Sequence, residues 1–346
     1  MNYPESLKIG DTIGICAPSA GIGEDEYKIK RYEAALAQLR EMGYKVIETA
    51  NVRTDYKARS SSAETRAKEF MELYSNDEVK LIIFASGGEY LCEMIDYLDF
   101  DKLKTMKPKW MQGYSDITGI SFLFNTLLDI PTMYCQTIKD YAMRPLHRSL
   151  TDALKIESGE EIEQDSFDMY EADWTIGEEE DEEEKDPCAT YNLVNKVEWK
   201  NLFDQNRIEF QGRTLGGCLD SIQCYLGTKY DKINEYISRH EQDGIIWFLE
   251  CFEIPTPELL RKLWQMKRSG FFDKCNGIVF GRPLFIREDN GTTYYEALKD
   301  ILGDLNIPVI VDADIGHRSP QMAIVNGGIL KFVSENGKGK VYTYLK

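Results

Sequence analysis

Apolar residues in the first 135 positions follow two spacings in turn, which predict alternating strands and helices. Short apolar runs bounded by Gly, Pro or Ser are typical of buried strands. Between them, apolar residues recur every three or four positions, as on a helix with one buried face. The expected strands are 12–19, 44–47, 79–84, 109–114 and 131–135, and the expected helices are 32–42, 63–74, 91–98 and 117–128. This alternation predicts a largely parallel sheet that binds ligands at the carboxyl ends of its strands.

The periodic pattern stops at about residue 145 and resumes at about residue 206. Within the interruption, residues 178–184 are all acidic and repel one another, so we expect a solvated excursion there. Beyond it, the expected strands are 244–250, 277–282, 308–311, 322–325, 329–333 and 341–345, and the expected helices are 231–239, 256–264 and 294–302. The chain is therefore predicted to form an N-terminal α/β domain (1–145), an acidic linker or insertion (146–205) and a C-terminal domain (206–346).

The acidity of the chain is concentrated in one segment. The formal net charge is −18, but residues 157–186 contain 16 Asp and Glu and one Lys, which leaves only −3 for the remaining residues. A protein that binds nucleic acid needs a basic face to neutralise phosphates. Nucleic acid is therefore not an expected partner.

Composition places the chain among globular proteins. With 346 residues and 42% hydrophobic content it can form two cores, and no apolar run reaches the roughly 18 residues of a membrane span. The N-terminus has neither a basic start nor an apolar core, so we expect a cytoplasmic protein with no membrane partner. The eight cysteines include no Cys-x-x-Cys pair, and no dinucleotide or phosphate-loop motif is present. No metal or cofactor is expected.

Three residues with catalytic side chains each follow a predicted strand. Ser115 lies where strand 109–114 gives way to a helix, Glu250 ends a wholly apolar strand, and His317 follows strand 308–311 in a glycine-containing loop. A serine hydroxyl needs an imidazole to take its proton, and the imidazole needs a carboxylate to fix its tautomer. The serine and the histidine also have structural alternatives. Ser115 is a good helix N-cap, and a lone loop histidine is often structural.

Two further features bear on this chemistry. Gly87 and Gly88 follow strand 79–84, where backbone N–H groups can approach an oxyanion, although an ordinary tight turn has the same composition. Trp174 and Trp199 flank the acidic run, where they can either stack on a flat ligand or anchor the loop to the body. The Gly-x-Ser-x-Gly elbow of α/β-hydrolases is incomplete, because Ile117 stands at its last position.

Together these motifs resemble one family, the Ser-Glu-His hydrolases that comprise the LD-carboxypeptidases and the microcin C immunity peptidases. The likeness covers nearly the whole chain, and the order of serine, glutamate and histidine is its most specific part. The motifs that carry it are Gly10-Asp11-Thr12-Ile13-Gly14, Ala17-Pro18-Ser19, Gly87-Gly88, Tyr97-Leu98-Asp99, Gly113-Tyr114-Ser115-Asp116-Ile117-Thr118, Gly216-Gly217, Phe248-Leu249-Glu250 and Asp314-Ile315-Gly316-His317-Arg318-Ser319-Pro320.

The resemblance implies a role for each site residue. Ser115 would be the nucleophile, His317 the general base and Glu250 its orienting carboxylate, while the N–H groups of Gly88 and Asp116 would form the oxyanion hole. It further implies an N-terminal α/β domain, a C-terminal domain with a β-rich, barrel-like core, a site between them, and a homodimer. Members of this family cut an amide without a metal, in a cell-wall tetrapeptide or in a peptidyl- or aminoacyl-nucleotide.

The chain is more similar to the microcin C immunity branch than to the LD-carboxypeptidases. The long insertion at 145–205 and the strand Trp247-Phe248-Leu249-Glu250 are similar to that branch, in which an aromatic side chain can stack on the nucleotide base. Glu89-Tyr90 stands where LD-carboxypeptidases often carry Tyr-Gly. Gly87, Trp174 and Trp199 are accordingly candidates for substrate binding. Hydrolysis of a murein tetrapeptide and catalytically silent binding of a peptide or nucleotide are the alternatives.

Overall fold

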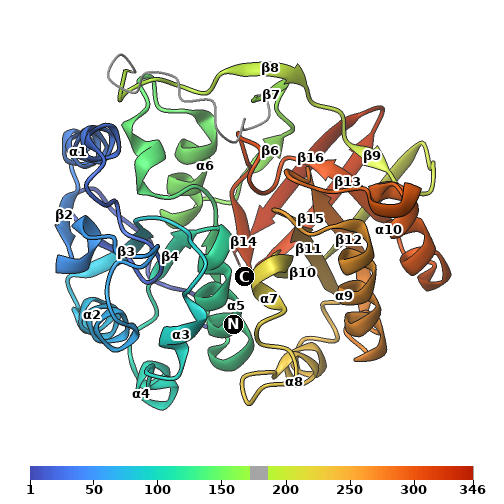
Figure 1. Ribbon diagram of the computed structural model, residues 1–346, viewed down its shortest axis with the longest axis horizontal. Helices are drawn as coiled ribbons and strands as arrows, with labels where there is room; N and C mark the ends of the chain where they lie inside the picture. The colour runs from blue at the N-terminus through green and yellow to red at the C-terminus, as the bar shows by residue number, and fades with distance from the viewer. Residues whose placement is uncertain (172–185, 346) are drawn as a thin grey trace. The chain divides into compact units, whose positions relative to one another are not determined.

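The computed structural model describes residues 1–171 and 186–345, and the chain divides into two compact units (Figure 1). The described residues of the first unit are 1–160 and 186–191, and those of the second are 161–171 and 192–345. Both units combine helices with a sheet that contains parallel strands. The expectation of an α/β fold in both halves of the chain is confirmed.

The first unit contributes five parallel strands to its sheet. They are β1 (Thr12–Cys16), β2 (Lys45–Glu48), β3 (Val79–Phe84), β4 (Trp110–Gly113) and β5 (Thr132–Tyr134), in the order β2-β1-β3-β4-β5. The strand order reverses between β1 and β3, and ligands of such sheets bind at the carboxyl ends of the strands beside this reversal. Residues that follow β1, β3 and β4 are therefore well placed to form a site.

Helices follow most of these strands, as expected for a parallel sheet. The longest begin at capping residues. Asp25 accepts a hydrogen bond from the Lys28 N–H at the start of α1, and Ser62 accepts one from the Thr65 N–H at the start of α2. The helices are α1 (Glu26–Glu41), η1 (Ala50–Arg53), α2 (Ala63–Ser75), α3 (Cys92–Ile95), α4 (Phe100–Thr105), η2 (Ser115–Ile117), α5 (Thr118–Leu128), η3 (Ile138–Ala142) and α6 (Arg148–Glu157).

The sheet of the second unit has eight strands in the order β6-β16-β15-β10-β11-β12-β13-β9. The four strands β10 to β13 are parallel, and every other pairing in the sheet is antiparallel. Their bounds are β6 (Glu163–Asp165), β9 (Lys200–Asn201), β10 (Arg207–Cys218), β11 (Ile245–Glu250), β12 (Cys275–Gly281), β13 (Val309–Ala313), β15 (Ile329–Glu335) and β16 (Lys338–Tyr344). Because β6 and β9 are its two edges, this β-rich core is an open sheet and not a closed barrel.

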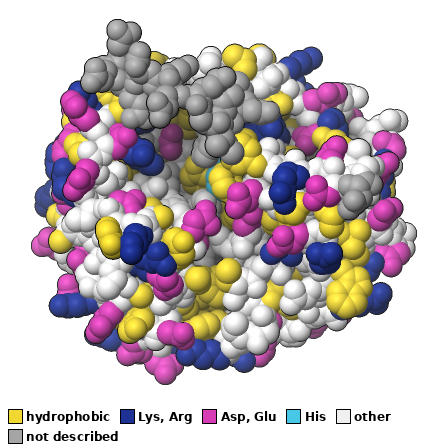
Figure 2. Space-filling model, in the orientation of Figure 1, with side chains coloured by type: hydrophobic (Ala, Val, Ile, Leu, Met, Phe, Trp, Pro, Cys, Tyr) yellow, Lys and Arg dark blue, Asp and Glu magenta, His cyan; other side chains and the backbone are white. Residues whose placement is uncertain are grey.

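The remaining elements of the second unit lie outside this eight-stranded sheet. Helix α10 begins with a capping box, in which Thr293 and Glu296 satisfy each other's backbone N–H groups. These elements are β7 (Met169–Glu171), β8 (Leu193–Lys196), α7 (Leu219–Ile222), α8 (Ile233–Arg239), α9 (Thr256–Arg268), η5 (Asp289–Gly291), α10 (Tyr294–Leu302), η6 (Gly303–Leu305) and β14 (Ile324–Asn326). Acidic and basic side chains are interspersed on the face of the molecule drawn in Figure 2.

Residues 212–217, for which the sequence predicted no strand, form the end of the longest strand, β10. Three glycines in this stretch are typical of a loop, yet each residue pairs with a neighbouring strand. A Cβ on Gly216 would lie 1.8 Å from the Phe248 carbonyl oxygen, so the glycine is needed for close approach of β10 to β11. In this stretch, glycine therefore allows close contact between neighbouring strands.

Two other expectations about local structure are corrected. The region from 145 contains the regular helix α6, whose buried residues include Leu150, Ala153 and Ile156. The helix expected over 91–98 is only the short α3, followed by a separate helix α4 that begins after the capping residue Asp99.

Candidate active site

Three turns meet at the carboxyl edge of the first unit's sheet. They follow β1, β3 and β4 and contain Ser19, Gly87-Gly88 and Ser115 respectively. The turns contact one another. The Ala20 N–H donates to the Gly87 carbonyl oxygen at 3.2 Å, and the Ser19 hydroxyl donates to Asp116 at 2.5 Å. The reversal in strand order between β1 and β3 thus brings together three motifs that lie far apart in the sequence.

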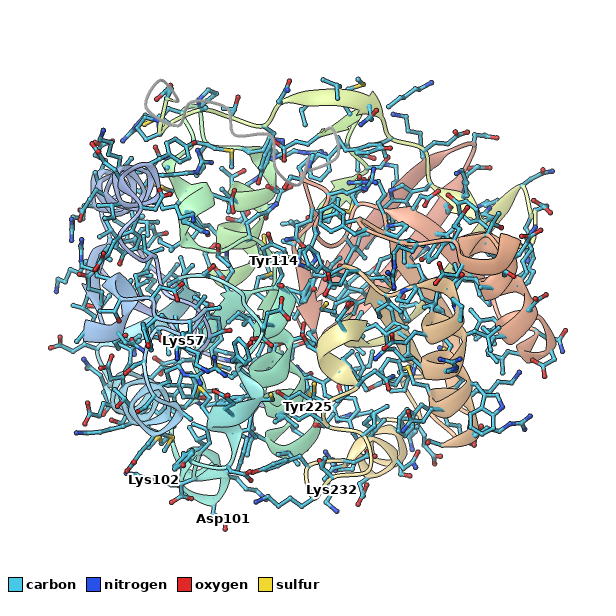
Figure 3. All side chains as sticks on the ribbon, viewed as in Figure 1. Lys57, Asp101, Lys102, Tyr114, Tyr225 and Lys232 are labelled. Carbon is cyan, nitrogen blue, oxygen red and sulfur yellow. The ribbon has the colours of Figure 1, made fainter. Side chains whose placement is uncertain are left out.

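Ser115 lies in a strained turn between β4 and α5. Its φ is 64°, a left-handed conformation that costs a residue other than glycine roughly 1–3 kcal/mol and that clusters at functional sites. Its N–H donates to the Tyr134 hydroxyl at 3.4 Å, and the preceding Tyr114, labelled in Figure 3, packs edge to face on Tyr134. Such a turn projects a serine hydroxyl from the end of a strand, as a nucleophile requires.

The elbow forms although only its first glycine is present. A Cβ on Gly113 would lie 2.9 Å from both the Ile117 Cγ2 and the Phe84 Cδ2 atoms, so glycine is required there. Ile117, at the position of the last glycine, is fully buried beneath the turn. The incomplete motif therefore does not prevent the strained turn.

Gly87 and Gly88 leave room for the serine and for a ligand. A Cβ on Gly87 would lie 2.9 Å from Ser115 Cβ, 3.0 Å from Ser115 Oγ and 3.7 Å from the Asp116 nitrogen. Gly88 has a φ of 151°, and a Cβ there would lie 2.4 Å from Ser19 Oγ. The two glycines thus allow this loop to lie directly against the serine turn.

The second unit contains the glutamate and the histidine of the predicted site as a hydrogen-bonded pair. Glu250, the last residue of β11, is fully buried, and His317 is 4% exposed. His317 Nδ1 lies 2.9 Å from Glu250 Oε2. When the carboxyl is ionised, Nδ1 carries the proton that it donates, and Nε2 becomes the proton-accepting atom of the ring. This is the arrangement that a general base needs.

A glycine and an aromatic ring shape the surroundings of His317. Gly316 has a φ of 96°, and a Cβ there would lie 2.8 Å from Glu250 Cβ and Oε2, so glycine is required next to the carboxylate. The Phe252 ring packs on the imidazole with centroids 4.6 Å apart. Asp220 accepts hydrogen bonds from the backbone N–H groups of Phe252 at 3.1 Å and Glu253 at 3.4 Å, and so fixes the loop that carries the ring.

The loop before His317 is anchored by a buried ion pair. Asp314 is fully buried, pairs with Arg282, and accepts hydrogen bonds from the Phe167 N–H at 3.1 Å and from the Trp199 indole N–H at 3.0 Å. Arg282 also donates to the carbonyl oxygens of Arg318 at 3.0 Å and Pro320 at 3.1 Å. These contacts hold the loop on both sides of the histidine.

Of the two tryptophans predicted to bind substrate, only Trp199 is among the described residues. Its side chain is 2% exposed and packs so closely on the chain at Gly339 that a Cβ there would lie 2.2 Å from the ring. The residue also lines a hollow of about 570 Å³ together with Lys200 and Tyr295. Trp199 is therefore buried, and its indole N–H anchors the buried Asp314. Trp174 lies outside the described residues.

The other two histidines have local structural contacts. His147 caps α6 by accepting the Ser149 N–H at 3.2 Å, and burial lowers the pKa of His147 to about 4. His240 follows α8 and packs on Tyr236 with ring centroids 4.6 Å apart.

Within residues 1–171 and 186–345, no group of three His, Cys, Asp or Glu side chains is arranged to hold a metal ion, and no helix is long and apolar enough to cross a membrane.

Ser19 and the Asp116 side chain belong to the site but were not singled out from the sequence for this role. From the sequence, only the backbone N–H of Asp116 was given a role, in the oxyanion hole. Its carboxylate accepts hydrogen bonds from Ser19 and from the Leu91 N–H at 2.9 Å. The Ala-Pro-Ser turn after the first strand was the one available signal.

Two family models match this chain. The LD-carboxypeptidase N-terminal domain matches residues 13–135, which include Ser115, and the LD-carboxypeptidase C-terminal domain matches residues 211–332, which include Glu250 and His317. The microcin C7 self-immunity protein of Escherichia coli is 25% identical over 329 residues, 93% of this chain and 90% of that protein. The Bacillus subtilis protein named "Probable murein peptide carboxypeptidase" is 24% identical over 332 residues, 94% of this chain and 90% of that protein.

Solved structures have the same fold. A microcin C7 self-immunity protein in complex with glutamyl sulfamoyl guanosine aligns with a TM-score of 0.79 at 21% identity, covering 100% of this chain and 99% of that one. A muramoyltetrapeptide carboxypeptidase from Oxalobacter formigenes aligns with a TM-score of 0.71 at 21% identity, covering 96% of this chain and 98% of that one. The chain belongs to the LD-carboxypeptidase family of peptidases, which includes the microcin C7 self-immunity protein.

Proposed function

We propose that this chain is a serine peptidase that cleaves an amide bond through an acyl-enzyme, with Ser115 as nucleophile, His317 as general base and Glu250 as its orienting carboxylate. The observation that carries the proposal is the buried Glu250–His317 pair, with its 2.9 Å hydrogen bond. A buried carboxylate on Nδ1 fixes the tautomer in which Nε2 can accept a proton. The strained turn at Ser115 supports the role of its hydroxyl as the proton donor.

Acylation would begin as His317 Nε2 takes the Ser115 hydroxyl proton while Oγ attacks the amide carbon. The resulting oxyanion would accept hydrogen bonds from the N–H groups of Gly88 and Asp116, whose loops contact each other in the first unit. Collapse of the intermediate breaks the C–N bond, and the imidazolium protonates the leaving nitrogen. The reaction requires Ser115 Oγ and His317 Nε2 to come within hydrogen-bond reach when substrate is bound.

Deacylation would use the same groups. His317 takes a proton from a water molecule, the hydroxide attacks the Ser115 ester, and the proton returns to Ser115 Oγ as the acyl group leaves. The oxyanion donors act again, because the second intermediate has the same charge distribution. No group besides the triad and these two N–H groups is needed for proton transfer or charge stabilisation in this cycle.

We propose an aminoacyl- or peptidyl-nucleotide as the substrate. Solved relatives that contain glutamyl sulfamoyl guanosine and aspartyl sulfamoyl adenosine have the same fold as this chain over nearly its full length. The second candidate is a murein tetrapeptide, favoured by similarity to the murein peptide carboxypeptidase of Bacillus subtilis. Both substrates offer the scissile amide that the triad chemistry requires.

The deciding experiment compares the parent protein with Ser115→Ala on aspartyl sulfamoyl adenosine and on a murein tetrapeptide. We expect Ser115→Ala to lose at least about 10⁴-fold in kcat on the preferred substrate. Ser75→Ala is the matched control, because Ser75 is an exposed serine at the end of α2. If Ser115→Ala kept the parental rate, the assignment of the nucleophile would be wrong. If the folded parent protein cleaved neither compound yet bound one, the silent binding role would replace the peptidase.

A further inference from the structure

The carboxylate of Asp116 joins the three turns at the carboxyl edge of the first unit's sheet. A single oxygen, Oδ2, accepts the Ser19 hydroxyl at 2.5 Å and the Leu91 N–H at 2.9 Å. Ser19 belongs to the turn after β1, Leu91 ends the glycine loop after β3, and Asp116 follows the serine itself. One side chain therefore ties together all three segments.

These hydrogen bonds lie in the interior. Ser19 is fully buried and Asp116 is 9% exposed. Burial raises the pKa of Asp116, while the hydrogen bonds from Ser19 and Leu91 and the charge of Arg66 lower it. A buried carboxyl group without such partners would cost several kcal/mol, so the donors around Asp116 are needed for it to be accommodated.

Arg66 also links the turn after β1 to the glycine loop. Its buried guanidinium donates to the carbonyl oxygens of Pro18 at 2.8 Å and Tyr90 at 2.9 Å, and it pairs with Glu93 at 2.8 Å. The turn after β1 and the glycine loop are thus bridged twice, once through Asp116 and once through Arg66. This leaves the glycine loop little freedom to shift relative to Ser115.

The anchored atoms lie next to the proposed oxyanion donors. The Gly87 carbonyl accepts the Ala20 N–H at 3.2 Å on one side of Gly88, and Leu91 is bound by Asp116 on the other side. The second donor is the Asp116 N–H itself, near the start of η2, where a helical N–H has no partner within the helix. A fixed Asp116 side chain therefore fixes both donors.

We infer that Ser19 and the Asp116 carboxylate are a positioning pair for the oxyanion hole, which hold the Gly88 and Asp116 N–H groups at the spacing that the tetrahedral intermediate requires. The inference rests on the proposed function. Neither side chain needs to touch substrate. Each acts through the backbone, so their loss would reduce stabilisation of the transition state more than binding of the ground state.

The size of the effect follows from the sensitivity of such sites to geometry. Removal of one oxyanion donor costs about 10²–10³-fold in kcat. A displacement of about 1 Å can cost about 100-fold. Ser19→Ala removes one hydroxyl and leaves the Leu91 bond, so we expect kcat to fall about 10-fold to 100-fold with little change in KM. Asp116→Ala loses both bonds and is expected to fall further.

Two variants separate positioning from a purely structural role. Asp116→Asn keeps one side-chain oxygen that can accept both Ser19 and Leu91, so its kcat is expected to lie between those of the parent and Asp116→Ala. Ser60→Ala is the matched control. Ser60 is a buried serine whose hydroxyl donates at 2.5 Å to the Ala17 carbonyl oxygen, which lies in the same turn as Ser19. Its hydroxyl is not bonded to Asp116. It is expected to lower stability while kcat stays within about twofold.

The experiment measures kcat, KM and the free energy of unfolding for the parent, Ser19→Ala, Asp116→Ala, Asp116→Asn and Ser60→Ala on whichever substrate the parent cleaves. At position 116, kcat is expected to fall from the parent to Asp116→Asn and again to Asp116→Ala. It is also expected to fall in Ser19→Ala and to stay unchanged in Ser60→Ala. Unchanged kcat in folded Ser19→Ala would overturn the inference, as would a loss expressed only in KM. If Asp116→Ala does not fold, Ser19→Ala decides alone. Full activity of Ser115→Ala would instead reject the proposed function itself.

Discussion

His317 Nδ1 and Glu250 Oε2 lie 2.9 Å apart in a buried pair, with the Phe252 ring against the imidazole. The carboxylate ends β11, and the histidine follows β13 in a loop that Gly316 allows to approach. A histidine held in this way has one nitrogen committed to the carboxylate. Its other nitrogen is thereby oriented for proton transfer.

Glu250→Gln is expected to lower kcat by about 10³–10⁴-fold with little effect on stability. The amide keeps the shape of the carboxyl group but cannot stabilise an imidazolium, and it permits the wrong tautomer. Steady-state kinetics with circular dichroism checks this. A folded Glu250→Gln protein with kcat within about twofold of the parent would show that the pair is structural.

Asp220→Ala is expected to lower kcat about 10-fold, because it releases the loop that carries Phe252 against His317. Phe252→Leu keeps apolar volume but not the ring face, so it separates the ring contact from the loop anchor. If the ring orients His317, both variants lose kcat. If only Asp220→Ala does so, the anchor matters and the ring does not.

Gly87→Ala is expected to reduce kcat by about 100-fold or more, because its Cβ would lie 3.0 Å from Ser115 Oγ and displace the nucleophile or the loop. Gly303→Ala is the control, since the nearest atom to its Cβ would be a Phe203 ring carbon 3.9 Å away. Kinetics of both variants test the contact. Parental activity in Gly87→Ala would contradict the geometry of the serine turn.

Trp199→Phe is expected to lower the free energy of unfolding by about 1–3 kcal/mol, because Asp314 loses its indole N–H donor. KM for either substrate is expected to stay unchanged, since the ring is buried. Chemical denaturation and steady-state kinetics give the two quantities. A rise in KM without loss of stability would instead support the predicted substrate-binding role of Trp199.

Glu157 predicts a pH dependence of stability in the first unit. Its side chain is fully buried, and within the described residues neither carboxyl oxygen has a hydrogen-bond partner. Burial raises the pKa of Glu157 well above its ordinary value, so the folded state keeps a proton that the unfolded state releases. The stability that the proton on Glu157 contributes is therefore fully present below the pKa of the unfolded state. It declines as pH rises through the pKa of the folded state, by at most about 1.4 kcal/mol per pH unit.

Glu157→Gln removes this proton linkage. The stability of Glu157→Gln relative to the parent is expected to increase as pH rises from about 5 to about 8. Only the parent has a buried carboxyl group at this position, and that group must either lose its proton or keep it at a pH where the unfolded chain releases it. Glu160→Gln, at an exposed position just beyond α6, is the control and should show no such trend. Denaturant unfolding at the two pH values measures it. Parallel curves for the parent and Glu157→Gln would contradict a neutral buried Glu157.

Much of the fold could be predicted from apolar spacing. The five parallel strands of the first unit were expected because each is a short apolar run between helical patterns. The Gly-rich strand end at 212–217 was not, because its reason is the close approach of β11, which is a tertiary contact. Helix α6 was missed since its buried face is short and charged residues flank it.

The site could be predicted residue by residue but not as a geometry. Ser115, Glu250 and His317 were each recognisable as polar residues after predicted strands, and the 2.9 Å Glu250–His317 contact confirms that two of them meet. The strained φ of Ser115 and the Ser19–Asp116 bond were not predictable, since both depend on how separate turns pack. The burial of Trp199 was also undecided, because flanking a charged run does not fix exposure.

The central claim is that Ser115 forms the covalent intermediate, and mass spectrometry tests it most directly. Parent protein incubated with a fluorophosphonate, then digested, is expected to carry the phosphonyl group on Ser115 and on no other residue. Ser115→Ala should remain unlabelled, and His317→Ala should be labelled far more slowly, while Ser75→Ala should match the parent. Labelling at another residue, or full turnover of substrate by Ser115→Ala, would contradict the account.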